Sequence, residues 1–335
     1  MAAFLHFLKS PRFTGKHSTQ NSGGEKPRVE RPRIGVALSS GGARGLAHIG
    51  VIQVLEENGI PVDAIVGTSI GAYVGGLWAS GLNGTELESL ASKIPGKRDL
   101  WKLVDPVFPP RRGFIGGGAI LERLDVTLKG KQFYDLKIPF VAVATELETL
   151  KRASLDIGDV SSAILASLAV PGVVVPVVRH GIEYIDGGVC DPLPVKLAKE
   201  YFDLDFVIGV NVLPPVGSLK QRRYKNEKLG VIRKCLRWLN ENGNYFAKGN
   251  LLDILRDAAM GSQMRLVERS AKAADVYIAA ISGRNGWHDY HNYREYIKIG
   301  REAATKALPE IGALLNPPAE CGSDLNLNRE NLKYA

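Results

Sequence analysis

Cysteine is scarce in this 335-residue sequence, and its three cysteines are widely separated. Cys190, Cys235 and Cys321 show no paired spacing. That argues against a disulfide framework and against a cysteine-based zinc site.

The sequence also lacks a long hydrophobic run. No stretch of about 18 apolar residues occurs, so no segment is predicted to span a bilayer. The first residues, MAAFLHFLKSPRF, start with a short apolar stretch. They have no preceding basic region and no apolar run of the length that a signal peptide needs. From these absences we expect a cytoplasmic protein.

What the sequence has is the composition of a soluble globular protein with an excess of positive charge. Hydrophobic residues make up 45% and charged residues 23%, and the formal net charge is +8. This charge indicates an anionic partner, and by itself it favours neither a membrane surface nor a nucleic acid.

The distribution of residue types along the chain predicts one large domain. We expect residues 1–32 to be a disordered basic leader, because they are rich in Ser, Gly, Pro, Lys and Arg. Residues 33–315 are expected to form the domain, and residues 316–335 a flexible tail. No internal repeat is present.

Within this domain, short apolar runs alternate with helical patterns. Continuous apolar runs are typical of strands that are buried on both faces. The fold class expected from this alternation is α/β, a three-layer α/β/α sandwich with a mainly parallel central sheet. The predicted strands are Arg33–Ser40, Val62–Gly67, Pro139–Leu147, Gly172–Val178, Phe206–Leu213 and Asp275–Ile281, and the last predicted helix is Tyr293–Leu315.

A Gly-x-Ser-x-Gly motif follows the second predicted strand and precedes a helical pattern. It consists of Gly67, Thr68, Ser69, Ile70 and Gly71. A strand–turn–helix with this motif is a nucleophile elbow, in which the tight turn leaves no room for bulky neighbours of the serine. The alternative is a glycine-rich turn with an incidental serine, since the sequence has 37 glycines.

A glycine-rich loop lies between the first predicted strand and its helix: Ser40, Gly41, Gly42, Ala43, Arg44 and Gly45. Its backbone N–H groups can point into one concavity that suits an anion. The dinucleotide and phosphate-loop patterns do not match, because Ser40 replaces the first glycine and no Gly-Lys-Ser/Thr occurs. An oxyanion hole for Ser69 fits, with Arg44 either adding positive charge or acting as a structural ion-pair partner. His48 is expected to be a packing residue.

The third motif is Asp186-Gly187-Gly188, at the end of a β-type run. Alone, it is typical of a simple turn. Beside Ser69, a carboxylate at a strand end can accept the serine proton.

In their order and context, these three motifs resemble the patatin-like phospholipase family. Ser69 comes 28 positions after Gly41, and Asp186 comes 117 positions after Ser69. The resemblance continues through ASLAVPGVVVPV, DVYIAAI and HDYHNYREYIKIGREAA. The resemblance covers roughly Ile34 to Leu315, with the motif-bearing core at about 34–200. Within the family, the sequence is similar to the bacterial group related to the esterase domain of neuropathy target esterase.

The resemblance implies a Ser–Asp dyad that hydrolyses a phospholipid, lysophospholipid or related lipid ester through an acyl-serine. Ser69 would be the nucleophile and Asp186 the general base, with Gly187 and Gly188 forming the dyad turn. The backbone N–H groups around Gly42, Ala43 and Arg44, within the loop from Gly41 to Gly45, would form the oxyanion hole. No metal, cofactor or nucleic acid is implied. Three positions depart from the family pattern: Ser40, Val174 and Asp191.

Two other functions stay open at this stage. One is an α/β-hydrolase with a Ser–Asp–His triad, because His288 and His291 follow Asp186. The other is a non-catalytic protein that binds anionic membranes. The segment 220–239 is basic and has apolar residues at helical spacing, so it predicts either a membrane-surface helix or an ordinary helix with its apolar face in the core.

Overall fold

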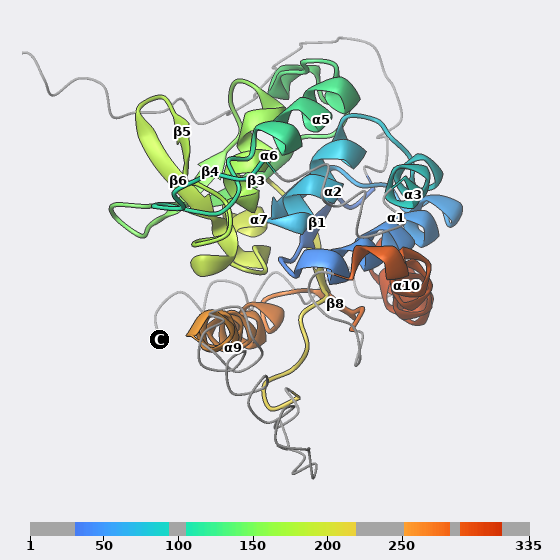
Figure 1. Cartoon of the computed structure of the whole chain (residues 1–335). Coiled ribbons are helices and arrows are strands. Elements are labelled where there is room, and N and C mark those ends of the chain that lie inside the picture. The colour runs from blue at the N-terminus through green and yellow to red at the C-terminus, as the bar shows by residue number, and fades with distance from the viewer. Residues whose placement is uncertain (1–30, 94–104, 219–250, 282–288, 317–335) are drawn as a thin grey trace, which may run out of the picture. The chain divides into compact units, whose positions relative to one another are not determined.

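A single eight-stranded sheet forms the centre of the computed structural model (Figure 1). The structure describes residues 31–93, 105–218, 251–281 and 289–316. Seven of the strands follow the order β5-β6-β3-β2-β1-β7-β8, and β4 pairs with β3. The strands are β1 (Ile34–Leu38), β2 (Ala64–Thr68), β3 (Phe140–Glu146), β4 (Arg152–Leu155), β5 (Val177–Arg179), β6 (Ile182–Asp186), β7 (Phe206–Asn211) and β8 (Val276–Ala279).

The sheet is parallel at its centre and antiparallel at one end. β1, β2, β3, β7 and β8 pair in parallel. β4, β5 and β6 form only antiparallel pairs. The mainly parallel α/β sheet predicted from the continuous apolar runs is therefore confirmed, since such strands are covered on both faces.

Helices lie on both faces of this sheet. The α-helices are α1 (Ala47–Glu57), α2 (Ile70–Ala79), α3 (Gly84–Ser92), α5 (Gly118–Leu128), α6 (Val160–Leu168), α7 (Val195–Tyr201), α9 (Leu251–Ala271) and α10 (Tyr293–Leu315). The 3-10 helices are η1 (Gly42–Leu46), η2 (Phe133–Asp135), η3 (Gly187–Val189) and η4 (Tyr290–Asn292).

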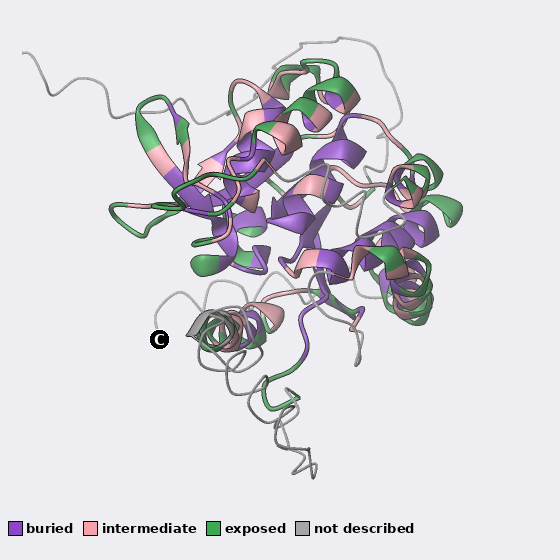
Figure 2. Cartoon of the chain, in the orientation of Figure 1, coloured by how far each residue is buried: buried purple, intermediate pink, exposed green. Residues whose placement is uncertain are grey.

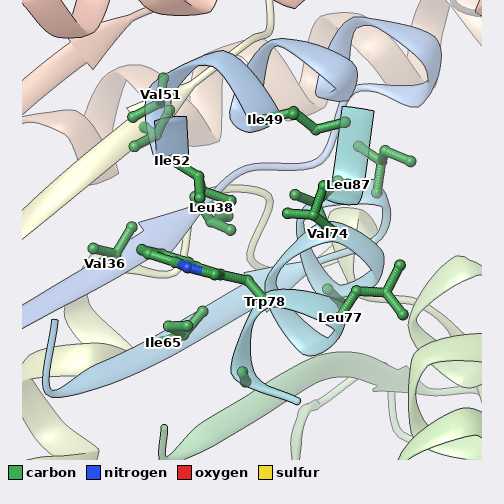
Figure 3. Close-up of a cluster of buried hydrophobic side chains, with 14 of the residues drawn as sticks. Val36, Leu38, Ile49, Val51, Ile52, Ile65, Val74, Leu77, Trp78 and Leu87 are labelled. Atoms are coloured by element: carbon green, nitrogen blue, oxygen red, sulfur yellow. The ribbon is translucent and has the colours of Figure 1, made fainter. Parts of the chain in front are cut away.

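Two hydrophobic clusters, one on each face, hold the layers together. Val36 and Leu38 of β1 belong to the larger cluster with α1, α2, α3, α5, α6 and α10. Ala37, between them in sequence, belongs to the smaller cluster with α7 and α9, as the alternation of side chains along a strand requires. Figure 2 shows the strands at the centre of the sheet as almost wholly buried. Figure 3 shows side chains of β1, β2, α1, α2 and α3 gathered in the larger cluster.

The register along β3 decides where the ends of β2 and β6 lie. Val143 pairs with both Thr68 and Ser154, and the next residue, Ala144, pairs with both Ala153 and Asp186. β2 and β6 therefore follow one another along the same edge of β3, and β4 occupies the other edge. The carboxyl ends of two strands that are far apart in the sequence meet at this point.

Most of the predicted elements match the observed ones. The last helix runs over the predicted residues Tyr293–Leu315, and the run ending in Asp186 is β6. The strand predicted over Gly172–Val178 is wrong, because only its last two residues belong to β5. The reason is local: Gly172 has a φ of 77°, and the N–H groups of Val173 and Val174 both bond to the Val170 carbonyl in a turn.

Some predictions fall outside the described residues. They include almost all of the leader (1–32), nearly all of the tail (316–335) and the segment 220–239. Among the helices that the structure does describe, none combines the length and the apolar character that crossing a bilayer requires.

Candidate active site

Ser69 lies at the turn between β2 and α2, as the elbow motif predicts. Its φ is 56°, in the left-handed region that non-glycine residues rarely adopt. A Cβ on Gly67 would lie 2.7 Å from the Cα of Ala72, and one on Gly71 would lie 2.7 Å from the Ser39 carbonyl oxygen. The two glycines therefore allow the strand, the turn and the start of the helix to approach this closely.

Asp186, the last residue of β6, is hydrogen-bonded to Ser69. The Ser69 hydroxyl donates to Asp186 Oδ2 at 2.5 Å, and the Gly188 N–H donates to Oδ1 at 2.6 Å. The contact follows from the β3 register, which sets the end of β6 beside the end of β2. The structure thus brings together two side chains that are 117 positions apart in the sequence.

The environment of Asp186 is unusual for a carboxyl group. The residue is only 3% exposed. Burial raises its pKa to about 6, against the opposing effect of the hydrogen bonds from the Ser69 hydroxyl and the Gly188 N–H. A carboxylate with this pKa is a stronger base than a solvated one and is still ionised at neutral pH, as a general base must be.

A residue that sequence reasoning missed, Ser167 of α6, fixes the backbone of the elbow. The Ser69 N–H donates to Ser167 Oγ at 2.8 Å, and the Ser167 hydroxyl donates to the Val143 carbonyl at 2.6 Å. These bonds link the turn to β3. Ser167 lies within the stretch ASLAVPGVVVPV that carries part of the family resemblance, and that is the signal from which it could have been found.

Hydrogen bonds hold Ser39 and Ser40, the residues from which the glycine-rich loop starts. The Ser39 N–H donates to the Val210 carbonyl at 3.0 Å, and the Ser40 N–H donates to the Pro192 carbonyl at 2.9 Å. Ser39 Oγ also accepts from the Val212 N–H at 3.0 Å. The loop that follows is therefore fixed at its base to β7, to the turn after Asp186 and to the residues after β7.

Gly41 to Gly45 lie in and just before the short helix η1, next to the elbow. Gly42 has a φ of 59°, which favours glycine. A Cβ on Gly45 would overlap the Ile70 side chain, so η1 packs directly on the residue after Ser69. The first N–H groups of a helix have no carbonyl partner within it, which makes those of η1 candidates for binding an oxyanion.

Two polar side chains of this region are buried. Arg44 has little exposed surface, so its cation lies inside the protein next to the loop. His48 of α1 is fully buried, and its Nε2–H donates to the Ser39 carbonyl at 2.9 Å. Burial lowers the pKa of His48 to about 4, against the raising effect of that bond. His48 is therefore neutral, and it supports the base of the loop, in keeping with the predicted packing role.

The remaining histidines do not complete a triad within the described residues. His180 lies in the β5–β6 turn and is exposed, with a φ of 50°. His291 lies in η4 and is also exposed. His6, His17 and His288 lie outside the described residues. The hydrogen-bond partner of the Ser69 hydroxyl is Asp186 and not a histidine.

Two further side chains near the dyad come from the C-terminal part of the chain. A Cβ built on Gly188 would lie 2.8 Å from Gln263 Nε2, 2.9 Å from Asp186 Oδ1 and 3.2 Å from Ser40 Oγ, so α9 reaches the dyad turn. The second side chain is Tyr290 of η4. Burial, and after it the electrostatic interactions with Tyr73 and Asp186, raise the pKa of Tyr290 to about 12. No sequence signal marked Gln263 as a site residue, because its position depends on how α9 packs.

Elsewhere, a surface hollow of 840 Å³ lies between α1, α3 and α10. Its lining is strongly charged and includes Glu57, Glu88 and Arg301. None of the predicted site residues lines this hollow. We therefore take the candidate active site to be at Ser69 and Asp186 and not here. In the described part of the chain, no group of three His, Cys, Asp or Glu residues is arranged to hold a metal ion.

About half of the chain is similar to a known protein family. Residues 36–199 match the model of the patatin-like phospholipase family. An NTE family protein of Mycobacterium tuberculosis is 39% identical over 183 residues, which are 54% of this chain and 49% of that protein. The chain thus spans about half the length of the mycobacterial relatives it matches.

A second relative aligns over more of this chain. The lysophospholipase nte1 of Emericella nidulans is 28% identical over 272 residues, covering 80% of this chain and 17% of that protein. Among solved structures, VipD from Legionella pneumophila aligns with a TM-score of 0.45 and 16% identity, over 84% of this chain and 67% of that one.

Proposed function

The chain carries a domain of the patatin-like phospholipase family in residues 36–199, and from this premise we propose that it hydrolyses lipid acyl esters with Ser69 and Asp186. One observation carries the proposal. The hydroxyl of a serine at a strained elbow donates at 2.5 Å to a buried carboxylate. The substrate class is that of the family, phospholipids, lysophospholipids or related lipid esters.

In the first half of the reaction, Ser69 Oγ attacks the ester carbonyl carbon while Asp186 Oδ2 takes the hydroxyl proton. The carbonyl oxygen becomes an oxyanion, for which the N–H groups of Gly42, Ala43 and Arg44 are the donors. The α2 N-terminus at Ser69 adds a favourable dipole. When the intermediate collapses, Asp186 returns the proton to the leaving alcohol and the acyl group stays on Ser69.

In the second half, Asp186 acts again as the base. It takes a proton from water, the resulting hydroxide attacks the acyl carbon, and Ser69 leaves with the proton that Asp186 held. The Gly188 N–H bond to Oδ1 holds the carboxylate in orientation through both halves. The Ser69 hydroxyl donates directly to the carboxylate, with no histidine between them, which supports a dyad over a triad.

A serine-directed probe tests the proposal. The wild-type chain should be labelled by a fluorophosphonate, and it should release fatty acid from a lysophospholipid. A non-catalytic membrane-binding protein would show neither result. Labelling without lipid hydrolysis would support the assignment of the nucleophile and contradict the lipid substrate class.

The raised pKa of Asp186 predicts the acid limb of the pH profile. The general base must be ionised, so kcat/KM should fall as pH decreases through about 6 and approach a tenfold loss per pH unit below that value. The measurement is kcat/KM for a soluble ester between pH 4.5 and 8. Replacing the exposed His291 with alanine should leave the limb in place, whereas a limb near pH 4 would contradict the assignment of Asp186.

Gly42→Val should lower kcat/KM by about 10²–10³-fold, the usual loss when one oxyanion donor is misplaced. Valine disfavours the φ of 59° at this position, so the loop should change conformation and turn an N–H away from the reacting carbonyl. Steady-state kinetics on a soluble ester provide the measurement.

Gly59→Val is the matched control for this loss. Gly59 has a φ of 62° and no atom within 4 Å of its added Cβ, and it lies just beyond the end of α1, away from Ser69. Both variants should lose a similar, small amount of thermal stability, and only Gly42→Val should lose activity. Equal kinetics in the two variants would show that the oxyanion hole lies elsewhere in the protein.

A further inference from the structure

Ser40, at the start of the glycine-rich loop, carries a buried hydroxyl group that bonds to nothing. Only 3% of the residue is exposed, and its Oγ finds no hydrogen-bond partner among the described residues. The backbone here is fixed, because the Ser40 N–H donates to the Pro192 carbonyl at 2.9 Å. A buried hydroxyl without a partner destabilises a protein, so its presence at this position needs an explanation.

The Ser40 hydroxyl lies beside the dyad carboxylate. A Cβ built on Gly188 would lie 3.2 Å from Ser40 Oγ and 2.9 Å from Asp186 Oδ1. The same point lies 2.8 Å from Gln263 Nε2. Polar groups from the loop after β1, from the end of β6 and from α9 therefore surround one side of the dyad turn.

The packing of α9 explains why Gln263 faces this turn. Val267 is 3% exposed and belongs to the smaller hydrophobic cluster. Residues four positions apart lie on the same face of a helix, so Gln263 is on the face of α9 that packs against the rest of the domain. Its amide group can donate two hydrogen bonds and carries no charge.

Acylation of Ser69 changes the hydrogen bonding of Asp186. In the free enzyme the carboxylate accepts from the Ser69 hydroxyl at Oδ2 and from the Gly188 N–H at Oδ1. In the acyl-serine, the hydroxyl proton has gone to the leaving alcohol and Ser69 Oγ is an ester oxygen that cannot donate. The buried carboxylate then loses one of these bonds, although it can accept about four, just when it must be ionised to take a proton from water.

We propose that Ser40 and Gln263 are positioning residues for deacylation, whose hydroxyl and amide groups donate to the Asp186 carboxylate once Ser69 is acylated. The inference rests on the proposed hydrolysis by Ser69 and Asp186 and assigns two further residues to its second half. Side-chain rotation turns both donors toward Oδ1 in that state. The added bonds keep the carboxylate ionised and oriented toward the hydrolytic water.

Pre-steady-state kinetics of the full chain with a nitrophenyl ester test this role, because acylation releases nitrophenol and deacylation does not. Ser40→Ala should release a burst of about one nitrophenol per active site, followed by a steady-state rate about tenfold or more below that of the wild type. kcat and KM should fall together, so kcat/KM, which reports acylation, should change much less. Gln263→Met should behave in the same way, since methionine keeps the length of the side chain and has no N–H donor.

The pH dependence of kcat is a second readout, which a purely structural role would not move. Hydrogen bonds to the ionised form lower the pKa of a carboxyl group. Removing a donor with Ser40→Ala should therefore shift the acid limb of kcat, which reports the acyl-enzyme, to higher pH. The acid limb of kcat/KM belongs to the free enzyme and should stay near pH 6, the pKa that burial gives Asp186.

Other titratable groups lie close to Asp186 on neighbouring elements. Burial raises the pKa of Tyr290 in η4 to about 12 and raises the pKa of the Cys190 thiol after η3, so both groups stay neutral over the range of the experiment. Asp191 is held in an ion pair. A limb that moves in Ser40→Ala and disappears in Asp186→Asn is therefore assigned to Asp186.

Ser161→Ala is the matched control for Ser40→Ala. Ser161 Oγ is also buried and without a hydrogen-bond partner among the described residues, and it lies near the start of α6, away from the dyad turn. Ser262→Ala controls for Gln263→Met, because it removes a polar group from the exposed side of α9. Both control variants should keep the wild-type kcat and the wild-type acid limb.

Equal losses of kcat and kcat/KM in Ser40→Ala and Gln263→Met would overturn the proposal, because the two residues would then support the shape of the site and not deacylation. Wild-type kinetics in both variants would overturn it as well. Failure of the proposed function is distinguishable from either result, since the wild type itself would then form no acyl-enzyme and release no nitrophenol.

Discussion

Ser69→Ala is expected to lower kcat/KM for any ester substrate by about 10⁴-fold or more and to abolish labelling by a fluorophosphonate. The variant removes the atom that forms the acyl intermediate, and no neighbouring hydroxyl is held in its place. The backbone at this position, with its φ of 56°, can be adopted by alanine at a cost similar to that for serine. The fold should therefore persist, as a cooperative thermal transition would show.

Ser161→Ala is the control for this substitution. Ser161 is also buried and lies near the start of α6, on the same helix as Ser167 but away from the turn. It removes the same hydroxyl group and should retain wild-type kinetics and full labelling. If Ser69→Ala turned over a nitrophenyl ester at the wild-type rate, the assignment of the nucleophile would be wrong.

Asp186→Asn is expected to lower kcat/KM by about 10³–10⁴-fold. The amide keeps the shape of the side chain and can still accept the Gly188 N–H bond, but it cannot take the proton of the Ser69 hydroxyl. The acid limb near pH 6 should disappear from what activity remains, because the group that titrates there is gone. The measurement is the full pH profile of the variant.

Asp191→Asn is the matched control for the carboxylate. Asp191 comes five residues after Asp186, and its carboxylate pairs with Arg152 at 3.0 Å. It should retain most of the activity. The opposite pattern, in which His291→Ala is as damaging as Ser69→Ala and Asp186→Asn is only mildly impaired, would replace the dyad with a triad.

The sequence by itself determined the features whose cause is local. Gly67 and Gly71 occur where added Cβ atoms would collide with the backbone of the next turn or strand, so the tight elbow leaves a trace in the sequence. Gly42 occurs where φ is positive for the same kind of reason. The central strands were predictable because burial on both faces demands continuous apolar runs.

The short β4 strand, Arg152–Leu155, left no such trace, and no prediction covered it. It borders the sheet beside β3 and alternates between exposed and buried residues over only four positions. The strand predicted over Gly172–Val178 failed for the opposite reason, because there the sequence signal was present and the strand was not. Its valines give a strong apolar signal, whereas Gly172 and the carbonyl of Val170 impose a turn.

Only the tertiary structure decided how the three motifs meet. The distance between Ser69 and Asp186 depends on β6 lying antiparallel to β3 on the same edge as β2, just beyond the end of β2. Strand pairing over such a sequence separation has no local signal. The same holds for Ser167, which reaches the elbow from α6, and for Gln263, which reaches the dyad turn from α9. The pKa of Asp186 also belongs here, because burial sets it, and burial is a property of the packed chain as a whole.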